Sequence, residues 1–280
     1  MSWSPTAIAS NLIVQNWQKD VVYLVQFPRA RTNLSVSPFA VKVETWLRIN
    51  KICYKNVDNK GRWSQRGQIP FIEYNGKEIN DSRYIIDFLT KELSAQIDDH
   101  LTTVQKAQAR LVEVLTDQEL TWILFWIRSK DIKSHYFSKN SMNDQLVFPM
   151  TVISPMVAWR MQRAFQDRCM SQGIGRFNEE EVQVIYRKDL AALTDILGEQ
   201  DYLFGDKPVT ADCFVFGQLM MFRYPPVETS FQKILNDEYP KLCAYMDRML
   251  ENWWPDWQEC RDTISLDTQF AKTFWPKQDE

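Results

Sequence analysis

The spacing of apolar residues changes once along this chain, near Lys91, and that change limits the folds open to it. Before Lys91, β-branched and aromatic runs of strand length alternate with amphipathic helical stretches. After Lys91, apolar residues recur at helical spacing and no strand pattern returns. The length of 280 residues also suits about two domains. We therefore expect an α/β domain followed by an all-α helical bundle.

The first part of the chain contains signals for both strands and helices. Residues 21–27 form a β-branched and aromatic run that ends at Pro28, and Ser37-Pro38 has the residue types preferred where a helix begins. Asn75-Gly76 is typical of a type I′ turn, so the strands on either side of it should form a hairpin. The predicted order is β-α-β-β-β-α in a mixed sheet, with strands at 21–27, 52–57, 70–74 and 77–79 and helices that begin at Ser37 and Asp81.

The second part of the chain is predicted to be helical. Residues 94–101 are polar and indicate a linker, after which Thr102 and Gln105 have the spacing of a capping box that opens a long helix through Ile127. The polar segment 129–146 is long for a connection and indicates a lid or an insertion. The periodic segments are 106–127, 151–170, 179–197, 210–222 and 240–254, which together predict a helical bundle.

Charge and cysteine content exclude several classes of protein. The 33 Lys and Arg residues against 36 Asp and Glu residues leave a net charge of −3, so no basic surplus would attract nucleic acid. No apolar run approaches the roughly 20 residues that cross a bilayer, and residues 1–18 lack the pattern of a signal peptide. Five cysteines without a Cys-x-x-Cys pair, and only two histidines, argue against a disulfide framework and a metal centre. We expect a cytoplasmic protein with no transmembrane segment and no metal.

Several motifs resemble the glutathione S-transferase superfamily. The run Gly67-Gln68-Ile69-Pro70-Phe71-Ile72, the Asn75-Gly76 turn and residues 79–89 are similar to the glutathione-binding half of that family. Within the superfamily the chain most resembles the failed axon connections and cadmium-responsive group, with metaxins nearby. The stretches that carry this second resemblance are 37–47, 173–181, 204–213 and 254–257.

The resemblance implies a particular division of the chain. A thioredoxin-like, glutathione-binding domain would occupy residues 19–93 and an all-helical domain residues 102–262, with extensions at 1–18 and 263–280 that the resemblance does not explain. Glutathione would be the co-substrate and a small hydrophobic electrophile its partner in the reaction. Members of this superfamily often dimerise through the two domains, so a homodimer is a further expectation.

The resemblance and the local chemistry together predict a glutathione site. A cis peptide bond before Pro70 would leave the main chain of Ile69 at an open edge, where an extended tripeptide can pair as an added strand. The helix that begins at Asp81 and Ser82 offers unpaired N–H groups and partial positive charge to the γ-glutamyl carboxylate, and the Gln68 amide would complete the cradle. The alternative is that Asp81 and Ser82 only cap their own helix.

Three further residues are assigned roles by the resemblance. Lys60 and Trp63 lie in the loop where the family holds the glycyl carboxylate, Lys60 as a point charge and Trp63 through its indole N–H. Ser37 would be the catalytic residue: its hydroxyl would donate to the glutathione thiolate and lower the thiol pKa from about 8.5 towards neutrality. Ser37 also suits a helix cap, and the two roles are compatible. Where other classes have a reactive tyrosine this chain has Gln26.

The electrophile pocket is predicted between the domains. Trp122, Phe125 and Trp126 lie at helical spacing after the linker, and such aromatic residues would bind an apolar substrate. The same spacing is typical of core residues, which is the alternative. Asp212 is expected to be structural, accepting a hydrogen bond from the N–H of Val209 or Thr210 where a helix begins.

Two functions follow from these observations. The leading hypothesis is a glutathione-binding transferase that adds or exchanges the glutathione thiolate on a small apolar electrophile, as in detoxification. Ser37-Pro38-Phe39 is also similar to the start of the first helix in glutathione-dependent ether-cleaving enzymes. The alternative is a non-catalytic, axonal or metaxin-like scaffold for protein contacts, which the lack of a Tyr or Cys at the usual reactive positions favours. The fold by itself does not decide between them.

Overall fold

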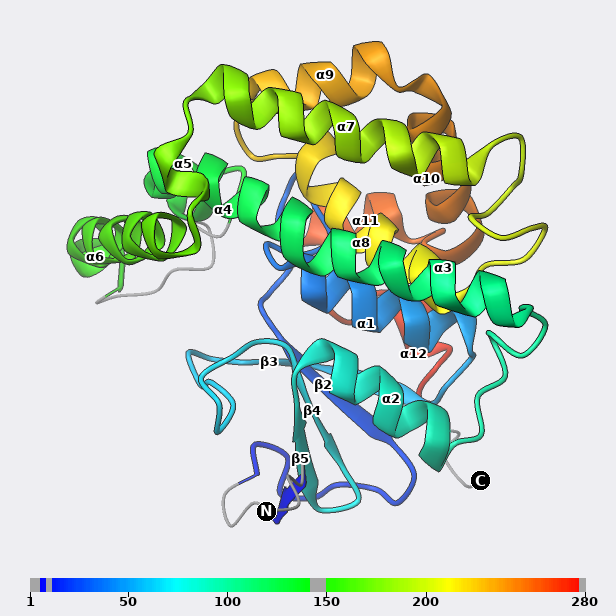
Figure 1. Ribbon diagram of the computed structural model, residues 1–280. Helices are drawn as coiled ribbons and strands as arrows, with labels where there is room; N and C mark the ends of the chain where they lie inside the picture. The colour runs from blue at the N-terminus through cyan, green and yellow to red at the C-terminus, as the bar shows by residue number, and fades with distance from the viewer. Residues whose placement is uncertain (1–5, 9–11, 142–149, 277–280) are drawn as a thin grey trace.

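A β-sheet carrying two helices forms one layer of the molecule, and a larger group of helices packs beside it (Figure 1). The computed structural model describes residues 6–8, 12–141 and 150–276. The sheet has five strands in the order β1-β5-β4-β2-β3. They are β1 (Thr6–Ile8), β2 (Val22–Gln26), β3 (Tyr54–Asp58), β4 (Phe71–Tyr74) and β5 (Lys77–Asn80).

The sheet is mixed because a crossover and a hairpin both contribute to it. Strands β2 and β3 are parallel and are connected through α1 (Pro38–Ile49). Strands β4 and β5 are antiparallel, and Asn75 and Gly76 between them have φ values of 46° and 78°, as a type I′ turn requires. The predicted hairpin is confirmed. Strand β1, which pairs with β5, was not predicted, because three residues are too few to show a periodic pattern.

The apolar residues of the strands pack against α1 and α2 (Ser82–Glu92). Burial of each large apolar side chain contributes about 1.5–3 kcal/mol relative to exposure. The buried cluster contains Val22, Leu24, Ile72 and Ile79 from the sheet and Val43, Trp46, Leu47, Ile85 and Leu89 from the helices. The predicted order β-α-β-β-β-α is thus confirmed, with β1 added at one edge.

The helical part is built around α8 (Thr210–Arg223), whose residues 210–222 are all buried. A helix buried along its whole length belongs in the centre of a bundle. None of the helices in the described ranges is long and apolar enough to cross a membrane. The other elements are α3 (Thr103–Val114), a π-helical turn (Leu115–Leu120), α4 (Thr121–Lys130), α5 (Ile132–Phe137), α6 (Met150–Gln172), a 3-10 turn (Ile174–Arg176), α7 (Glu179–Leu197), α9 (Ser230–Glu238), α10 (Pro240–Trp253), α11 (Trp257–Thr263) and α12 (Gln269–Lys272).

The two parts of the molecule meet where α1 packs on α8 (Figure 1). A Cβ atom on Gly217 would lie 2.6 Å from the carbonyl oxygen of Pro38 and 3.0 Å from the amide nitrogen of Lys42. Because a side chain does not fit at that distance from main-chain atoms, glycine allows the two helices to approach closely. The start of α1, which carries Ser37, is therefore held by the helical part.

The long helix predicted through Ile127 is interrupted in the structure. Residues 115–120 form a π-helical turn between α3 and α4, which hydrophobic spacing alone does not reveal. Helices α5, α9, α11 and α12 were not predicted, because they are short and their patterns are weak. In the polar segment 129–146, residues 132–137 form α5, and residues 142–149 lie outside the described residues.

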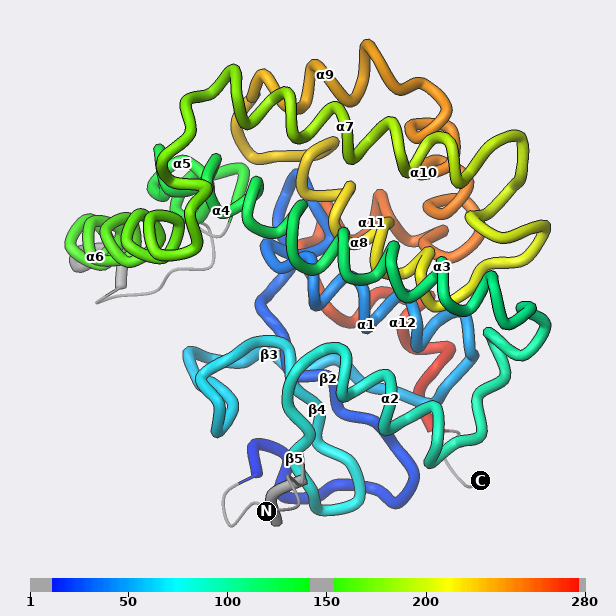
Figure 2. Tube along the Cα trace, in the orientation of Figure 1, coloured from blue at the N-terminus to red at the C-terminus, as the bar shows by residue number. Residues whose placement is uncertain are grey.

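The C-terminal segment after α11 returns to the sheet layer (Figure 2). The amide of Tyr54, at the start of β3, donates to the carbonyl oxygen of Phe274 at 3.2 Å, and the two rings lie 5.3 Å apart. The Asn56 amide donates to the carbonyl oxygen of Leu266 at 3.1 Å. The described part of the extension 263–280 therefore packs against the N-terminal part of the protein.

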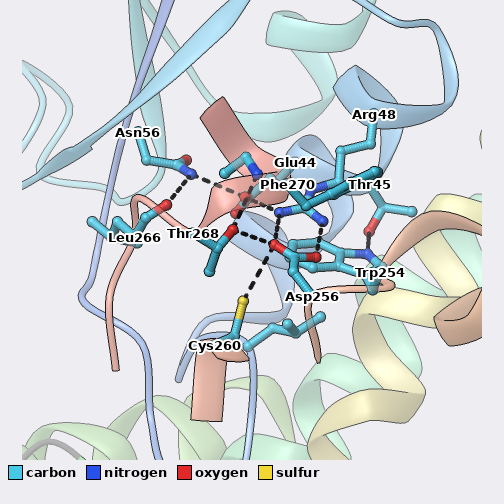
Figure 3. Close-up of polar contacts among 12 residues, drawn as sticks. Glu44, Thr45, Arg48, Asn56, Trp254, Asp256, Cys260, Leu266, Thr268 and Phe270 are labelled. Carbon is cyan, nitrogen blue, oxygen red and sulfur yellow. Dashed lines mark hydrogen bonds and ion pairs between the residues drawn. The ribbon is translucent and has the colours of Figure 1, made fainter. Parts of the chain in front are cut away.

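A buried group of charges joins α1 to Asp256, the residue just before α11 (Figure 3). We call Arg29, Glu44, Arg48 and Asp256 the interdomain ion cluster; their side chains are at most 1% exposed. Glu44 accepts from Arg29 at 2.6 Å and from Arg48 at 3.3 Å, and Arg48 also donates to Asp256. Burial by itself would raise the pKa of Glu44, but the charges of Arg29 and Arg48 outweigh it and lower the pKa to about 2.

Asp212 supports the start of α8, as predicted. Its carboxylate accepts from the amide of Val209 at 2.7 Å, from the amide of Leu203 at 3.1 Å and from the hydroxyl of Tyr245 at 3.0 Å. The Thr210 amide donates elsewhere, to Asp98 at 2.8 Å. Complete burial raises the pKa of Asp212 to about 7, against the effect of these hydrogen bonds. Its contacts account for a structural role.

Candidate functional site

A cleft of about 430 Å³ is lined by residues from both parts of the molecule. Its volume lies in the range of about 300–1,000 Å³ that is typical of small-molecule sites. The lining comes from the start of α1, the loop before β4, the start of α2 and the helices α4 to α6. Of the residues predicted to contact glutathione, the cleft is lined by Ser37, Trp63, Gln68, Ile69, Pro70, Asp81 and Ser82.

The loop before β4 presents Gln68 and Ile69 to the cleft. The Ile69-Pro70 peptide bond is cis, which confirms the prediction. No hydrogen bond joins the main chain of Ile69 to another described residue, so its N–H and C=O are available to a ligand. The loop itself is held by Ser64, whose hydroxyl accepts from the Gln68 amide at 3.0 Å and whose amide donates to the Gln68 carbonyl oxygen at 3.3 Å.

The start of α2 also faces this cleft. Asp81 caps the helix, because its carboxylate accepts from the Arg83 amide at 3.0 Å. Asp81 adopts φ 73° and ψ 126°, a costly conformation for a residue other than glycine and one that often marks a functional site. Ser82 is the first helical residue, 6% exposed, and its hydroxyl has no hydrogen bond to another described residue. The helix start therefore keeps both a hydroxyl and main-chain N–H groups for an anion.

A charged cluster beside α2 was not predicted from the sequence. Lys42 of α1 donates to both oxygens of Asp117, at 3.0 and 2.8 Å, and Nε of Arg83 lies 3.4 Å from Asp117. Burial lowers the pKa of Lys42, although Asp117 opposes the shift. Asp117 belongs to the π-helical turn, and both it and Arg83 line the cleft. The available sequence signal was a lysine between Val41 and Val43 on an apolar helix face.

Ser37 lines the cleft at the N-terminus of α1 and is 6% exposed. Its hydroxyl oxygen accepts from the amide of Ala40 at 3.4 Å, and its amide donates to the hydroxyl of Ser35 at 3.2 Å. A hydroxyl that accepts at a helix cap still has its own proton to donate. Ser37 is thus a cap, and its O–H remains free to bind a negative atom in the cleft.

The structure separates Trp63 from Lys60, which the resemblance had grouped together. Trp63 lines the cleft, is 56% exposed and packs edge-on against Phe27 with ring centres 5.8 Å apart. Lys60 is exposed, has φ 47° and does not line the cleft, and its amide donates to the Asp58 carboxylate at 2.9 Å. The structure places Lys60 on the loop surface outside the cleft lining, and its contact with the glycyl carboxylate stays a prediction.

The helical half of the cleft is lined largely by aromatic residues. Trp122 and Phe125 of α4 line it as predicted, with ring centres 5.6 Å apart. Phe125 also lies 4.9 Å from Phe165 of α6, and Tyr136 of α5 lies 6.2 Å from Phe165. Tyr136 was also considered from sequence, as an aromatic residue soon after α4, whereas Phe165 was not assigned to the pocket. These aromatic rings provide flat apolar surfaces on several sides of the cleft, against which an apolar molecule can pack.

Trp126 does not line the cleft, although it was predicted to do so. It is 4% exposed and packs in the helical core, with its ring 6.2 Å from that of Phe231. The reason is geometric: in a regular helix Trp126 lies about 40° to one side of Trp122 and Phe125 about 60° to the other side. Here that rotation turns Trp126 into the core while Phe125 stays at the cleft.

The chain matches the models of two protein-domain families, one over its N-terminal part and one over its helical part. The glutathione S-transferase N-terminal domain matches residues 38–134, and the glutathione S-transferase C-terminal domain matches residues 186–249. Failed axon connections of Drosophila melanogaster is 30% identical over 97% of this chain and 67% of its own length. Isoprene-epoxide–glutathione S-transferase of Rhodococcus sp. (strain AD45) is 27% identical over 78% of this chain and 93% of its own. Metaxin-3 of Danio rerio is 26% identical over 73% of this chain and 69% of its own.

A solved structure agrees with this at the level of the fold. Beta-etherase LigF from Sphingobium sp. strain SYK-6 aligns with a TM-score of 0.54 and 19% identity, over 87% of this chain and 98% of that chain. The thioredoxin-like sheet domain and the helical C-terminal domain are those expected for this fold. The chain belongs to the glutathione S-transferase superfamily, in the failed axon connections and metaxin-like group.

Proposed function

We propose that the protein binds glutathione in this cleft and transfers its thiolate to a small apolar electrophile. The observation that carries the proposal is the meeting, in one cleft, of Ser37, the unpaired main chain of Ile69 and the start of α2 at Ser82. These groups lie on three separate segments. The similarity to an isoprene-epoxide–glutathione S-transferase supports a transferase.

Each part of the tripeptide has a counterpart in the cleft. The γ-glutamyl carboxylate binds the N–H groups at the start of α2, the Ser82 hydroxyl and the nearby guanidinium of Arg83. The Asp81 carboxylate accepts from the α-ammonium group. The Gln68 amide completes the cradle of the γ-glutamyl end. The cysteinyl main chain pairs with Ile69 as an added strand, and the Trp63 indole N–H binds the glycyl carboxylate.

The chemistry depends on the sulfur of the bound peptide. The Ser37 hydroxyl donates to the thiolate, and the partial positive charge at the start of α1 stabilises the same negative charge, so the thiol loses its proton to solvent more readily. The sulfur then attacks the electrophilic carbon and a C–S bond forms. In a substitution, the bond from carbon to the leaving group breaks and its electrons depart with that group. In an epoxide, the C–O bond breaks and its electrons stay on the oxygen. The rings of Trp122 and Phe125 hold the apolar body of the electrophile.

A second candidate is a non-catalytic scaffold that keeps the fold for protein contacts. The observation that favours it lies on β2, where other classes have a tyrosine. Gln26 there is 0% exposed, and its amide donates to Glu44 at 2.7 Å and to Asn56 at 2.8 Å, so it does not act on a thiol. Similarity to failed axon connections and metaxin-3, whose names state no transferase activity, supports this candidate as well.

Calorimetry with reduced glutathione tests the proposal. The wild type should bind it saturably, and Ser82→Ala should weaken binding about tenfold, because a hydrogen bond to a charged group contributes about 1.5–3 kcal/mol. Ser230→Ala is the matched control, since Ser230 is also a first helical residue, in α9, and does not line the cleft. Undetectable binding at millimolar ligand would overturn the proposal. Binding without turnover of 1-chloro-2,4-dinitrobenzene would favour the scaffold.

A further inference from the structure

Arg128 of α4 is buried without an acidic partner among the described residues. It is 5% exposed and lines the helical half of the cleft. Its Nη1 donates to the hydroxyl of Tyr136 at 2.8 Å, and its Nη2 lies 3.4 Å from the sulfur of Met221, a weak acceptor. Its Nε has no hydrogen-bond partner within the part of the chain that the structure describes. Most of the donor capacity of this guanidinium is therefore unused.

The other buried lysine and arginine side chains of the described ranges each face a carboxylate. These pairs are Arg29 with Glu44, Lys42 with Asp117, and Arg48 with Asp256. A buried charge with no counter-ion is costly, which is why buried cations are usually paired. Arg128 differs from the others in that it lines an open cleft, where a ligand can bring the missing negative charge.

No carboxylate of the described residues forms an ion pair with Arg128, and the nearest titratable neighbour is uncharged. His135 is 6% exposed, and burial together with the charge of Arg128 lowers its pKa to about 4, so its ring is neutral at pH 7. From Thr121 onwards, the residues that line the cleft include Arg128 and Arg168 but no Asp or Glu. Arg168 lies on α6, which packs beside α4 and α5 (Figure 1), and is exposed. The electrostatic field in this half of the cleft favours an anion.

The apolar and charged groups are close enough to act on one small molecule. The guanidinium carbon of Arg128 lies 5.0 Å from the centre of the Tyr136 ring, and that ring lies 6.2 Å from Phe165. Because the Tyr136 hydroxyl accepts from Arg128, its own proton is free to donate to a ligand. A guanidinium and a hydroxyl at the edge of flat apolar surfaces suit a planar molecule with a carboxylate at one end.

We propose that Arg128, together with the Tyr136 hydroxyl, binds a carboxylate carried by the electrophilic substrate, so that the cleft selects anionic electrophiles over neutral ones. The inference rests on the proposed transferase function, because it names the substrate class of the same cleft. Arg128 is then the residue that determines specificity, and Trp122 and Phe125 bind the apolar body between this carboxylate and the thiolate.

The test uses two electrophiles of nearly equal size and opposite charge state, the anionic 4-chloro-3,5-dinitrobenzoate and the neutral 4-chloro-3,5-dinitrobenzamide. With either one, the thiolate sulfur attacks the carbon that bears chlorine, a C–S bond forms, and the C–Cl bond breaks with its electrons leaving on chloride. The kcat/KM for each electrophile is divided by its uncatalysed rate constant with glutathione. The resulting ratio for the wild type should favour the benzoate by about tenfold to a hundredfold, because one hydrogen bond to a charged group contributes a factor of this size. Arg128→Met should abolish the preference mainly through KM, and Arg128→Lys should keep part of it.

Two controls separate the possible failures. Arg163→Met removes an exposed arginine of α6 that does not line the cleft, and it should keep the full preference. Calorimetry of the two glutathione conjugates measures the same preference without turnover.

If the wild type binds glutathione but binds both conjugates equally, the inference is overturned and the proposed function stands. If it binds no glutathione, the proposed function itself fails. Thermal unfolding checks that Arg128→Met is folded; if it is not, Arg128→Lys decides the outcome.

Discussion

The guanidinium of Arg48 and the carboxylate of Asp256, 208 residues apart in the sequence, form a buried ion pair between α1 and the start of α11. Arg48 also stacks on Trp254, 3.6 Å from the ring centre, and the indole N–H of Trp254 donates to Thr45 at 3.0 Å. The helix that begins at Ser37 is therefore fixed at its far end by residues near the end of the chain. Any movement between the two parts of the protein would break these contacts.

Replacement of Glu44 by Gln should destabilise the protein strongly. Arg29 and Arg48 would lose the charge that compensates their burial, and breaking a buried pair in this way costs about 3–5 kcal/mol. Glu238→Gln is the matched control, because Glu238 pairs with Arg187 at 2.7 Å on the surface and should contribute less than about 1 kcal/mol. Urea unfolding followed by circular dichroism measures both changes. Equal effects of the two variants would show that the interdomain ion cluster contributes no more than a surface pair.

Stability should fall steeply as the pH drops below 4.5. The pKa of Glu44 is 4.5 in the ordinary state and about 2 in the folded protein, so the folded state binds this proton more weakly than the unfolded state. The resulting stabilisation is complete above pH 4.5 and is lost as the pH falls towards 2. For Asp256, burial is outweighed by the hydrogen bonds and charge of Arg48, so its pKa is lowered too and adds to the effect. Thermal unfolding across this range should show a flatter profile for Glu44→Gln than for the wild type.

Ser37→Ala should raise the pKa of the bound glutathione thiol by about one unit or more, because one hydrogen bond to the thiolate is lost. It should also cost about 0.5–2 kcal/mol of stability, since the cap is lost. Thr102→Ala, which removes the cap of α3 away from the cleft, should reduce stability and leave the thiol unchanged. Ultraviolet titration of the bound thiolate measures the first effect. A lower stability with an unshifted thiol pKa would limit Ser37 to capping.

Two tryptophans four residues apart should respond differently to truncation. Trp126→Ala should cost about 3–5 kcal/mol of stability, because it leaves a cavity in the helical core. Trp122→Ala, at the cleft, should cost less and should raise KM for the electrophile instead. Denaturant unfolding and steady-state kinetics on the same two variants provide the comparison. If Trp126→Ala were the variant with the altered KM, the assignment of the pocket to Trp122 and Phe125 would be incorrect.

The sequence was sufficient for the sheet domain apart from the edge strand β1, because the signals of the other elements are local. Asn75-Gly76 specifies a turn, Ser37-Pro38 specifies a helix start, and strand-length runs lie between them. It was less informative about α9, α11 and α12, which are short and whose positions depend on partners elsewhere in the chain. The contact between Phe274 and Tyr54 is an example, since neither residue carries a local signal that names the other.

The candidate site was predictable where it depends on backbone segments with strong motifs. Ile69-Pro70 and Asp81-Ser82 belong to such motifs, and the structure brings both to the cleft. The charged residues of the site were missed, because a lone Arg128 or Lys42 in a helix has no sequence pattern that shows burial. Trp126 was wrongly assigned to the pocket. Neighbouring side chains of one helix point in directions about 100° apart, and helical spacing alone does not show which of them faces a cavity and which faces the core.

The π-helical turn at Leu115–Leu120 determines the direction in which each side chain of α4 points. Each residue added to or removed from a helix rotates the residues beyond it by about 100°. The loss of a single codon in that turn would swing Phe125 and Arg128 away from the cleft while α1 and α2 kept their places. One short insertion or deletion there would therefore change the helical half of the cleft without any change to the half that α1 and α2 provide.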